Sequence, residues 1–219
     1  SWFFEQWLYK GGEPHYKVSL RSGAESSERG TATTTLVDIE QIHPMDELTG
    51  VFRMPVVIEV HYTDGTKDSV RADVNAQRTL VEIPNTGRKT PSFVLFDPGS
   101  TILKKVTFDK PWDARVAQVK RAPRMIDRYD ALESFRGDTS RIQERLDIIE
   151  DVMDRERFHA MRSEAVGQAI ELGQAGVTHA WKTVERGFKD PAVEVRSATI
   201  NGLSIIPQSL KGAAERLLE

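Results

Sequence analysis

The run from Phe93 to Trp112 separates two parts of the sequence whose hydrophobic residues recur at different periods. Before this run, apolar and polar residues alternate in short stretches separated by turn residues, which is typical of β-strands. After it, apolar residues recur every three or four positions in long stretches rich in Arg, Glu and Ala, which is typical of helices. We therefore expect two modules in series, a β domain at 14–110 and an α-helical domain at 111–219, rather than one interleaved α/β sheet.

The first part contains about seven candidate strands, enough for a small sandwich or barrel. The clearest is a hairpin, because alternate residues of Met54–Tyr62 and of Val70–Val74 are apolar on either side of an Asp64-Gly65 turn. Pro55 predicts an edge strand or a strand start, since proline has no N–H to donate. The other candidate strands are Tyr16–Leu20, Leu36–Ile39, Leu80–Ile83, Phe93–Phe96 and Ile102–Phe108.

The second part reads as a series of amphipathic helices. Pro123 should break or kink the first of them, which begins after Pro111, and Gly137–Ser140 should form a turn. A strongly amphipathic helix follows over Ile142–Met153. Further helices are predicted over Met161–Leu172, Val177–Arg186, Val193–Ile205 and Ser209–Leu218.

A short pattern recurs three times in the helical part with a spacing of 34 residues. Each copy has an Arg, then a small residue three positions later and a branched residue after it, which suits close stacking of helix pairs. The copies begin at Arg128, Arg162 and Arg196. The last copy, Lys189–Leu203, contains Asp-Pro and Val-Arg and resembles the turn and second helix of a HEAT repeat. In that repeat, Asp-Pro starts the helix and the Arg supports the neighbouring unit.

The first ten residues predict a short helix that begins after Ser1 and ends at Gly11-Gly12. Ten residues do not hold a helix alone, and this one carries four large aromatic side chains, Trp2, Phe3, Phe4 and Trp7. Either the helix docks on the β domain or it is the last helix of a preceding domain. Because the chain opens at Ser1 rather than Met, we expect either a processed chain or a piece excised from a longer polypeptide, and we favour the excised piece.

Composition excludes several classes of function. The formal net charge of −3 over 219 residues gives no general attraction for nucleic acid. The absence of cysteine excludes disulfides, thiolate metal sites and a cysteine nucleophile. No apolar run reaches about 18 residues, so we expect no membrane span and a soluble protein, with cytoplasmic and periplasmic locations both open.

The five histidines offer no helical zinc pair, since no two of them are three or four residues apart. One Glu-x-x-His fragment, Glu156 with His159, matches half of a dinuclear carboxylate site, but a second such pair is missing. We expect a surface or helix-end role for this fragment and predict no metal-binding residue.

Other catalytic patterns are absent or weak. There is no Gly-x-Ser-x-Gly elbow for a serine hydrolase. The loops Asn85–Lys89 and Asp97–Ser100 lack the helix that follows a phosphate loop. Three helical carboxylates, Glu150, Asp151 and Asp154, could form an acid/base pair, although a solvated helix face is the simpler interpretation. We predict no catalytic or cofactor-binding residue.

Charge is uneven within the helical part. Lys110–Arg128 is mainly basic, whereas Glu144–Glu156 is mainly acidic. We expect the two segments to attract one another, each exposed pair contributing roughly 0 to 1 kcal/mol. The alternative is a basic groove for an acidic ligand.

Three stretches resemble the C-terminal region of M1-family zinc aminopeptidases (gluzincins). Ser1–Pro14, with Phe-Phe-Glu-Gln-Trp followed by Gly-Gly-Glu-Pro, is similar to the helix that closes the catalytic domain of that family. Phe52–Val60 with the Asp64-Gly65 turn, and Phe93–Gly99, resemble the β-sandwich domain of its bacterial members. The resemblance implies an Ig-like antiparallel β-sandwich of about seven strands followed by a HEAT-like α-helical repeat domain.

The sequence departs from the family at its catalytic motifs. The family binds zinc through His-Glu-x-x-His with a further Glu and the substrate amine through Gly-x-Met-Glu-Asn, and neither motif is present. No catalytic or zinc-binding residue can therefore be transferred to this chain. The resemblance implies that residues 1–13 are the terminal helix of a missing catalytic domain, which would hold the zinc.

These observations lead to one functional hypothesis and one alternative. The first is a non-catalytic C-terminal fragment of an M1-like aminopeptidase, which caps the active-site cavity where N-terminal residues are removed from peptides. Its expected partners are the missing catalytic domain of the same polypeptide and the peptide substrate, with no nucleic acid. The alternative is a HEAT-type scaffold for protein–protein interaction. Under the first hypothesis, Phe93–Trp112 would be the joint between the sandwich and the helical lid.

Overall fold

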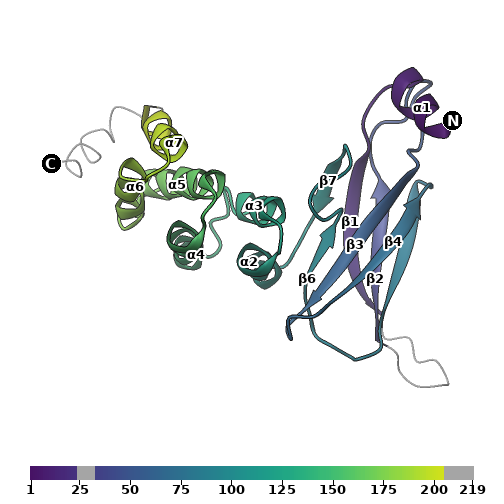
Figure 1. The fold of residues 1–219 in the computed structure, drawn as a ribbon, viewed down its shortest axis with the longest axis horizontal. Coiled ribbons are helices and arrows are strands. Elements are labelled where there is room, and N and C mark those ends of the chain that lie inside the picture. Colours follow the sequence, from purple (N-terminus) through teal and green to yellow (C-terminus); the bar gives the residue numbers. More distant parts are fainter. Residues whose placement is uncertain (24–32, 205–219) are drawn as a thin grey trace. The chain divides into compact units, whose positions relative to one another are not determined.

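The computed structural model describes residues 1–23 and 33–204, and the chain divides into two compact units, Ser1–Gln118 and Val119–Glu219 (Figure 1). Each unit is considered by itself. The predicted helix Ser209–Leu218 lies outside the described residues.

The first unit is built on two sheets. One has four strands in the order β5-β2-β1-β7, and the other has three in the order β4-β3-β6. The strands are β1 His15–Gly23, β2 Thr33–Gln41, β3 Met54–Tyr62, β4 Lys67–Val74, β5 Arg78–Asn85, β6 Pro91–Phe96 and β7 Lys105–Phe108.

Side chains from both sheets meet in one hydrophobic core. Every second residue of a strand points to the same face, and most of the alternating apolar residues of the sequence are buried in this core. They are Tyr16, Val18, Val37, Ile39, Met54, Val56, Ile58, Val60, Tyr62, Val74, Val81, Ile83, Val94 and Phe96. Leu20 and Leu80, which also belong to predicted strands, are exposed.

The predicted hairpin is confirmed. β3 and β4 pair antiparallel from Met54 opposite Val74 to His61 opposite Lys67. Gly65 in the connecting turn has a positive φ of 85°, a conformation that glycine adopts at little cost. Pro55 is the second residue of β3, and pairing with β6 begins only at Ile58, so proline occupies the strand start as expected.

Two features of the first unit differ from the expectation. The last strand begins at Lys105 rather than at Ile102. It also pairs parallel with β1, from His15 opposite Lys105 to Val18 opposite Phe108. The prediction that every strand pair of this domain is antiparallel is therefore wrong for β1 and β7. The remaining strand pairs are antiparallel.

The N-terminal segment forms helix α1 (Trp2–Phe4), which continues as a π-helical turn over Glu5–Tyr9. Gln6 anchors it to the β domain, because its side-chain amide accepts from the backbone N–H of Arg53 at 2.7 Å and donates to the carbonyl of the same residue at 3.3 Å. The ring of Trp7 packs on Phe52 with centroids 5.4 Å apart. The segment thus docks on the β domain, while Trp2, Phe3 and Phe4 remain exposed.

The described helices that follow are α2 Trp112–Arg121, α3 Met125–Glu133, α4 Ile142–Arg155, α5 His159–Gln174, α6 Ala180–Phe188 and α7 Val193–Ser204. Pro123 lies between α2 and α3 and separates them, as predicted. Within the second unit, α5 packs against α3, α4, α6 and α7. No helix in the described ranges is long and apolar enough to cross a membrane.

Glycines let the helices of the second unit approach closely. A Cβ on Gly187 of α6 would come within 2.4 Å of Thr199 Oγ1 and 3.0 Å of Val166. A Cβ on Gly173 of α5 would come within 2.6 Å of the Trp181 ring. These contacts explain why glycine stands inside helices, where it costs about 1 kcal/mol relative to Ala.

Candidate functional site

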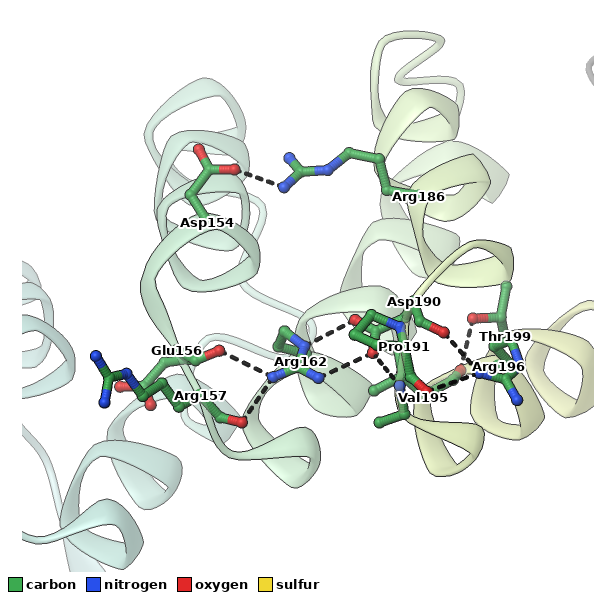
Figure 2. Close-up of polar contacts among 11 residues, drawn as sticks. Asp154, Glu156, Arg157, Arg162, Arg186, Asp190, Pro191, Val195, Arg196 and Thr199 are labelled. Carbon is green, nitrogen blue, oxygen red and sulfur yellow. Dashed lines mark hydrogen bonds and ion pairs between the residues drawn. The ribbon is translucent and has the colours of Figure 1, made fainter.

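The repeated arginines occupy equivalent places in three helices. Arg128, Arg162 and Arg196 are each the fourth residue of their helix, α3, α5 and α7. In each, Nη1 donates to the carbonyls five and six residues earlier, which closes the turn that leads into the helix. Figure 2 shows this arrangement for Arg162 and Arg196. The acceptors are Ala122 (3.0 Å) and Pro123 (3.3 Å), Glu156 (2.9 Å) and Arg157 (2.8 Å), and Asp190 (2.7 Å) and Pro191 (3.0 Å).

The other nitrogens of two of these arginines bind a carboxylate 28 residues downstream. Arg128 donates to both oxygens of Glu156, with Nε at 2.6 Å and Nη2 at 3.1 Å. Arg162 binds Asp190 in the same two-pronged way, at 2.7 and 2.8 Å (Figure 2). Such bidentate pairs are stronger and more directional than single charged hydrogen bonds.

We call the three arginines and the two acids the arginine ladder. Each acid is six residues before the next arginine of the series, so one residue serves two units. Its backbone carbonyl closes its own turn, and its carboxylate binds the arginine of the preceding unit. The 34-residue repeat of the sequence is therefore a repeat of contacts.

The carboxylate of Asp190 is held in its ionised form. The hydrogen bonds from Arg162 lower the pKa of Asp190 below its usual range, burial opposes this, and the backbone N–H of Ala192 lowers it further. The same interaction raises the pKa of Arg162. Both groups remain charged near neutral pH, so the ladder is a permanent structural link between α5 and the turn before α7.

A second polar network lies inside the helical unit and was not predicted from the sequence. Arg145 of α4 is only 1% exposed, and it binds both oxygens of Glu171 at 3.0 Å and the side-chain oxygen of Gln168 at 3.1 Å. Burial alone would raise the pKa of Glu171, but hydrogen bonds from Arg145 and from the Gly137 N–H bring it below its usual range. This network fixes α4 to α5.

Gln168 extends the network to α3. It is fully buried and donates to the carbonyl of Leu132 at 2.7 Å and to Glu164 at 2.9 Å. Glu164 in turn accepts from Arg136 at 2.7 Å. The sequence does contain a signal for this network, since Arg145 lies on the apolar stripe of α4 beside Leu146 and Ile149.

The suggested Glu-x-x-His fragment does not form a metal pair. Glu156 is bound by Arg128, and the ring of His159 packs against Phe158 with centroids 4.7 Å apart. Across residues 1–23 and 33–204, no group of three or more His, Asp or Glu side chains could hold a metal ion.

The three helical carboxylates each lie beside a basic side chain. Glu150 is 3.5 Å from His179, Asp151 is 2.6 Å from Arg155, and Asp154 is 2.5 Å from Arg186. Acid/base work by paired carboxylates needs two of them to share one site with pKa values held apart. This arrangement instead supports a solvated face with ion pairs.

The two glycine-containing loops are closed by their own side chains. Asn85 donates to the carbonyl of Lys89 and accepts from the N–H of the same residue. Asp97 is buried and binds Lys104 at 2.5 Å, Thr101 at 2.5 Å and the Ile102 N–H at 3.1 Å. Burial would raise the pKa of Asp97, but these hydrogen bonds keep it lower than usual. Both loops have structural roles.

The predicted attraction between the basic and acidic segments is seen in the pair of Arg128 with Glu156. At the start of the basic segment, Lys110 binds Gln118 at 2.6 Å and lies over the Phe108 ring. These contacts favour a structural use of the charges, and no described contact points to a groove for an acidic ligand.

The first unit has a shallow hollow of about 170 Å³ beside the N-terminal helix. Its walls bring together one acid, one base and two aromatic rings. They are formed by Trp2, Glu5, Gln6, Lys10, Gly11, Gly50, Val51 and Phe52.

Comparison with known proteins gives a match in structure but not in sequence. No family model matches the chain, and no curated protein matches it. A crystal structure of Legionella pneumophila aminopeptidase A in complex with aspartic acid is similar, with a TM-score of 0.62 and 10% sequence identity. The match covers 98% of this chain and 29% of that one, so this chain spans less than a third of that protein. At this identity the likeness shows the fold.

Proposed function

We propose that this chain is a non-catalytic C-terminal part of an M1-like zinc aminopeptidase. The observation that carries the proposal is the similarity of nearly the whole chain to under a third of an aminopeptidase structure. The aromatic segment Ser1–Pro14 and the hairpin residues Phe52–Val60, which resemble the M1 family, support the same assignment.

In this proposal, the first unit is an Ig-like β-sandwich that spans residues 14–110, and the helices from residue 111 onward form a HEAT-like domain. The shared core of the two sheets supports the first part. The arginine ladder supports the second, since its 34-residue period links each unit to the next through Arg and an acid.

The proposed role is mechanical. The sandwich acts as a spacer and the helical domain caps the active-site cavity, so that peptides enter by their N-termini. Residues 1–13 dock on the β domain through Gln6 and Trp7. In this proposal the same residues also form the end of the missing catalytic domain, which holds the zinc and is the main partner. The exposed rings of Trp2, Phe3 and Phe4 support this, because uncovered aromatic surface of this kind marks an interaction site.

A HEAT-type scaffold without any peptidase in the parent protein is the second candidate. The observation that favours it is the ladder itself, since stacked helical repeats present extended binding surfaces.

The test begins with the upstream coding sequence and ends with activity. We expect His-Glu-x-x-His and Gly-x-Met-Glu-Asn a few hundred residues before Ser1, with zinc and aminoacyl-anilide turnover in the full polypeptide. The chain alone should show neither. Stoichiometric zinc with turnover in the chain alone would overturn the proposal, and an upstream region without the zinc motif would favour the scaffold.

A further inference from the structure

The N-terminal segment, residues 1–12, is attached to one loop of the first unit. This loop spans residues 42–53, between strands β2 and β3. The Gly11 N–H donates to the Leu48 carbonyl in the middle of the loop at 3.2 Å. The ring of Trp7 packs on the end of the same loop. Whatever fixes the loop therefore also fixes the segment.

His43 connects this loop to strand β1 and is only 8% exposed. Its Nε2 lies 3.0 Å from the Gly50 carbonyl oxygen, and its Nδ1 lies 3.5 Å from the backbone nitrogen of His15, the first residue of β1. Its ring packs edge-on against Phe52, with centroids 5.0 Å apart. Because Phe52 also carries the Trp7 ring, a stack of three rings leads from His43 to the N-terminal segment.

The partners of the His43 ring determine which of its nitrogens carries a hydrogen. A carbonyl oxygen only accepts, so Nε2 is the N–H donor to Gly50. The backbone N–H of His15 only donates, so Nδ1 offers its lone pair. The site therefore fits the neutral Nε2–H form of the imidazole. A proton added to Nδ1 would place two N–H groups against each other in a site with little access to water, which is unfavourable.

In the described part of the chain, no charged side chain makes a hydrogen bond or ion pair with His43 that could compensate this proton. The ring of His15 binds a hydroxyl of β7 at 2.8 Å. The backbone N–H groups of Thr49 and Leu48 donate to Asp46 and hold the pKa of its carboxyl below the usual range. The other charged side chains of the neighbouring elements make no described contact with the His43 ring, and they are Glu5, Lys10, Glu13, Lys17, Glu40, Glu47, Arg53 and Lys105.

We propose that His43 is an acid-sensitive latch, which in its neutral form holds the loop and the N-terminal segment on β1 and on protonation releases them. The open form accepts a proton that the closed form has no place for, so opening is favoured as pH falls. An ordinary imidazole takes up its proton near pH ~6.5, so closure is complete above about pH 7.5 and weakens below about pH 6.5. The inference rests on contacts within the first unit and not on the proposed peptidase function.

Amide hydrogen exchange in the 219-residue chain, followed by NMR, measures the opening. The Gly11 N–H reports release directly, because its exchange requires the bond to Leu48 to open. After division by the intrinsic exchange rate at each pH, the opening constant should rise about tenfold between pH 7.5 and pH 5.5. The Asp97 N–H, which donates to the Val57 carbonyl at 2.8 Å, is the internal reference and should not lose protection.

Three variants assign the effect to one histidine. His43→Gln keeps an amide donor and an acceptor but does not titrate, so the dependence on pH should disappear. His15→Gln removes the neighbouring histidine and His179→Gln removes an exposed one in the second unit, and both should keep the rise of about tenfold. Loss of the rise in His15→Gln, or its persistence in His43→Gln, overturns the proposal.

The wild-type protein gives a test that needs no substitution. NMR of the His43 imidazole nitrogens at pH 7.5 should show a hydrogen on Nε2 and none on Nδ1. A hydrogen on Nδ1 at this pH, or protection of the Gly11 N–H that stays constant down to pH 5.5, overturns the proposal even if His43→Gln fails to fold.

Discussion

At the scale of single residues, the ion pairs of the arginine ladder should stabilise the fold, whereas exposed ion pairs on the surface should contribute little. Arg162 makes four hydrogen bonds and its partner Asp190 is buried. Arg186 makes one bond to Asp154, and both of these side chains are largely exposed. The chemistry of the pairs is the same, so the difference in stability should come from burial and geometry.

Arg162→Gln should lower the free energy of unfolding by about 2 to 4 kcal/mol, because it leaves a buried carboxylate without its cation and two carbonyls without a donor. Arg186→Gln should cost about 0 to 1 kcal/mol. Urea denaturation of both variants gives the comparison. Similar losses in the two variants would contradict a structural role for the ladder.

Two buried tyrosines make a second test at this scale. The hydroxyl of Tyr16 is fully buried and has no hydrogen-bond partner in the described part of the chain, whereas Tyr62 donates to Asp68 at 2.8 Å. Burial and that bond raise the pKa of Tyr62 to about 12. Tyr16→Phe should therefore be neutral or stabilising, because it removes an unsatisfied polar group and keeps the ring against Phe96.

Tyr62→Phe should lose about 0.5 to 1.5 kcal/mol, the net value of one hydrogen bond. Thermal unfolding of both variants against the wild type is the measurement. A larger loss at Tyr16 than at Tyr62 would show that the Tyr16 hydroxyl has a partner in solution.

At the scale of elements, glycines inside helices are explained by what lies opposite them. Gly187→Ala would bring a methyl group against Thr199 and Val166, so the helices α6 and α7 would have to move apart at a cost of about 1 to 3 kcal/mol. Gly167→Ala in α5 meets only the flexible end of Arg136, at 3.1 Å. It should be neutral or stabilising by up to about 1 kcal/mol through helix propensity.

The two alanine variants have opposite expected signs, and chemical denaturation of each decides between them. If both variants gain stability, the close approach of α6 and α7 is not maintained in solution. If both lose it, the Arg136 contact is stiffer than its exposed position indicates.

The elements that sequence patterns predicted well are those whose signal is local. The β3–β4 hairpin follows from alternation around Asp64-Gly65, and the break at Pro123 follows from the chemistry of one residue. The parallel pairing of β7 with β1 was missed because its partner is some 90 residues away and no local pattern encodes direction.

The same contrast applies to the candidate site. The spacing of 34 between the arginines was visible in the sequence, but the acids they bind lie 28 residues on, in another turn, and were found only in the structure. Arg145 and Gln168 were missed because a polar residue on the apolar face of a helix normally argues against its burial. In this fold both side chains are buried, and their hydrogen bonds are made with partners from neighbouring segments.

At the scale of the whole molecule, both units rely on ionised carboxylates that are held by hydrogen bonds. The pKa values of Glu59 and Asp97 in the first unit, and of Glu171 and Asp190 in the second, all lie below their usual values of 4.5 for Glu and 3.8 for Asp. In the three cases other than Asp190, burial opposes the shift most strongly, and hydrogen bonds from charged and neutral donors overcome it.

A depressed pKa in the folded state means that the unfolded chain binds protons first as pH falls. The stability contributed by these four acids is therefore complete above about pH 5 and is lost progressively as pH falls below about 4.5, through the unfolded and then the folded pKa values. We expect both units to lose stability over this acid range.

Asp190→Asn should reduce the slope of unfolding free energy against pH below 4.5, while lowering stability at neutral pH. Urea unfolding at pH 7, 5, 4 and 3, followed by circular dichroism for wild type and Asp190→Asn, measures this slope. Parallel curves for the two proteins would mean that the Arg162–Asp190 pair does not set the acid sensitivity of the helical unit.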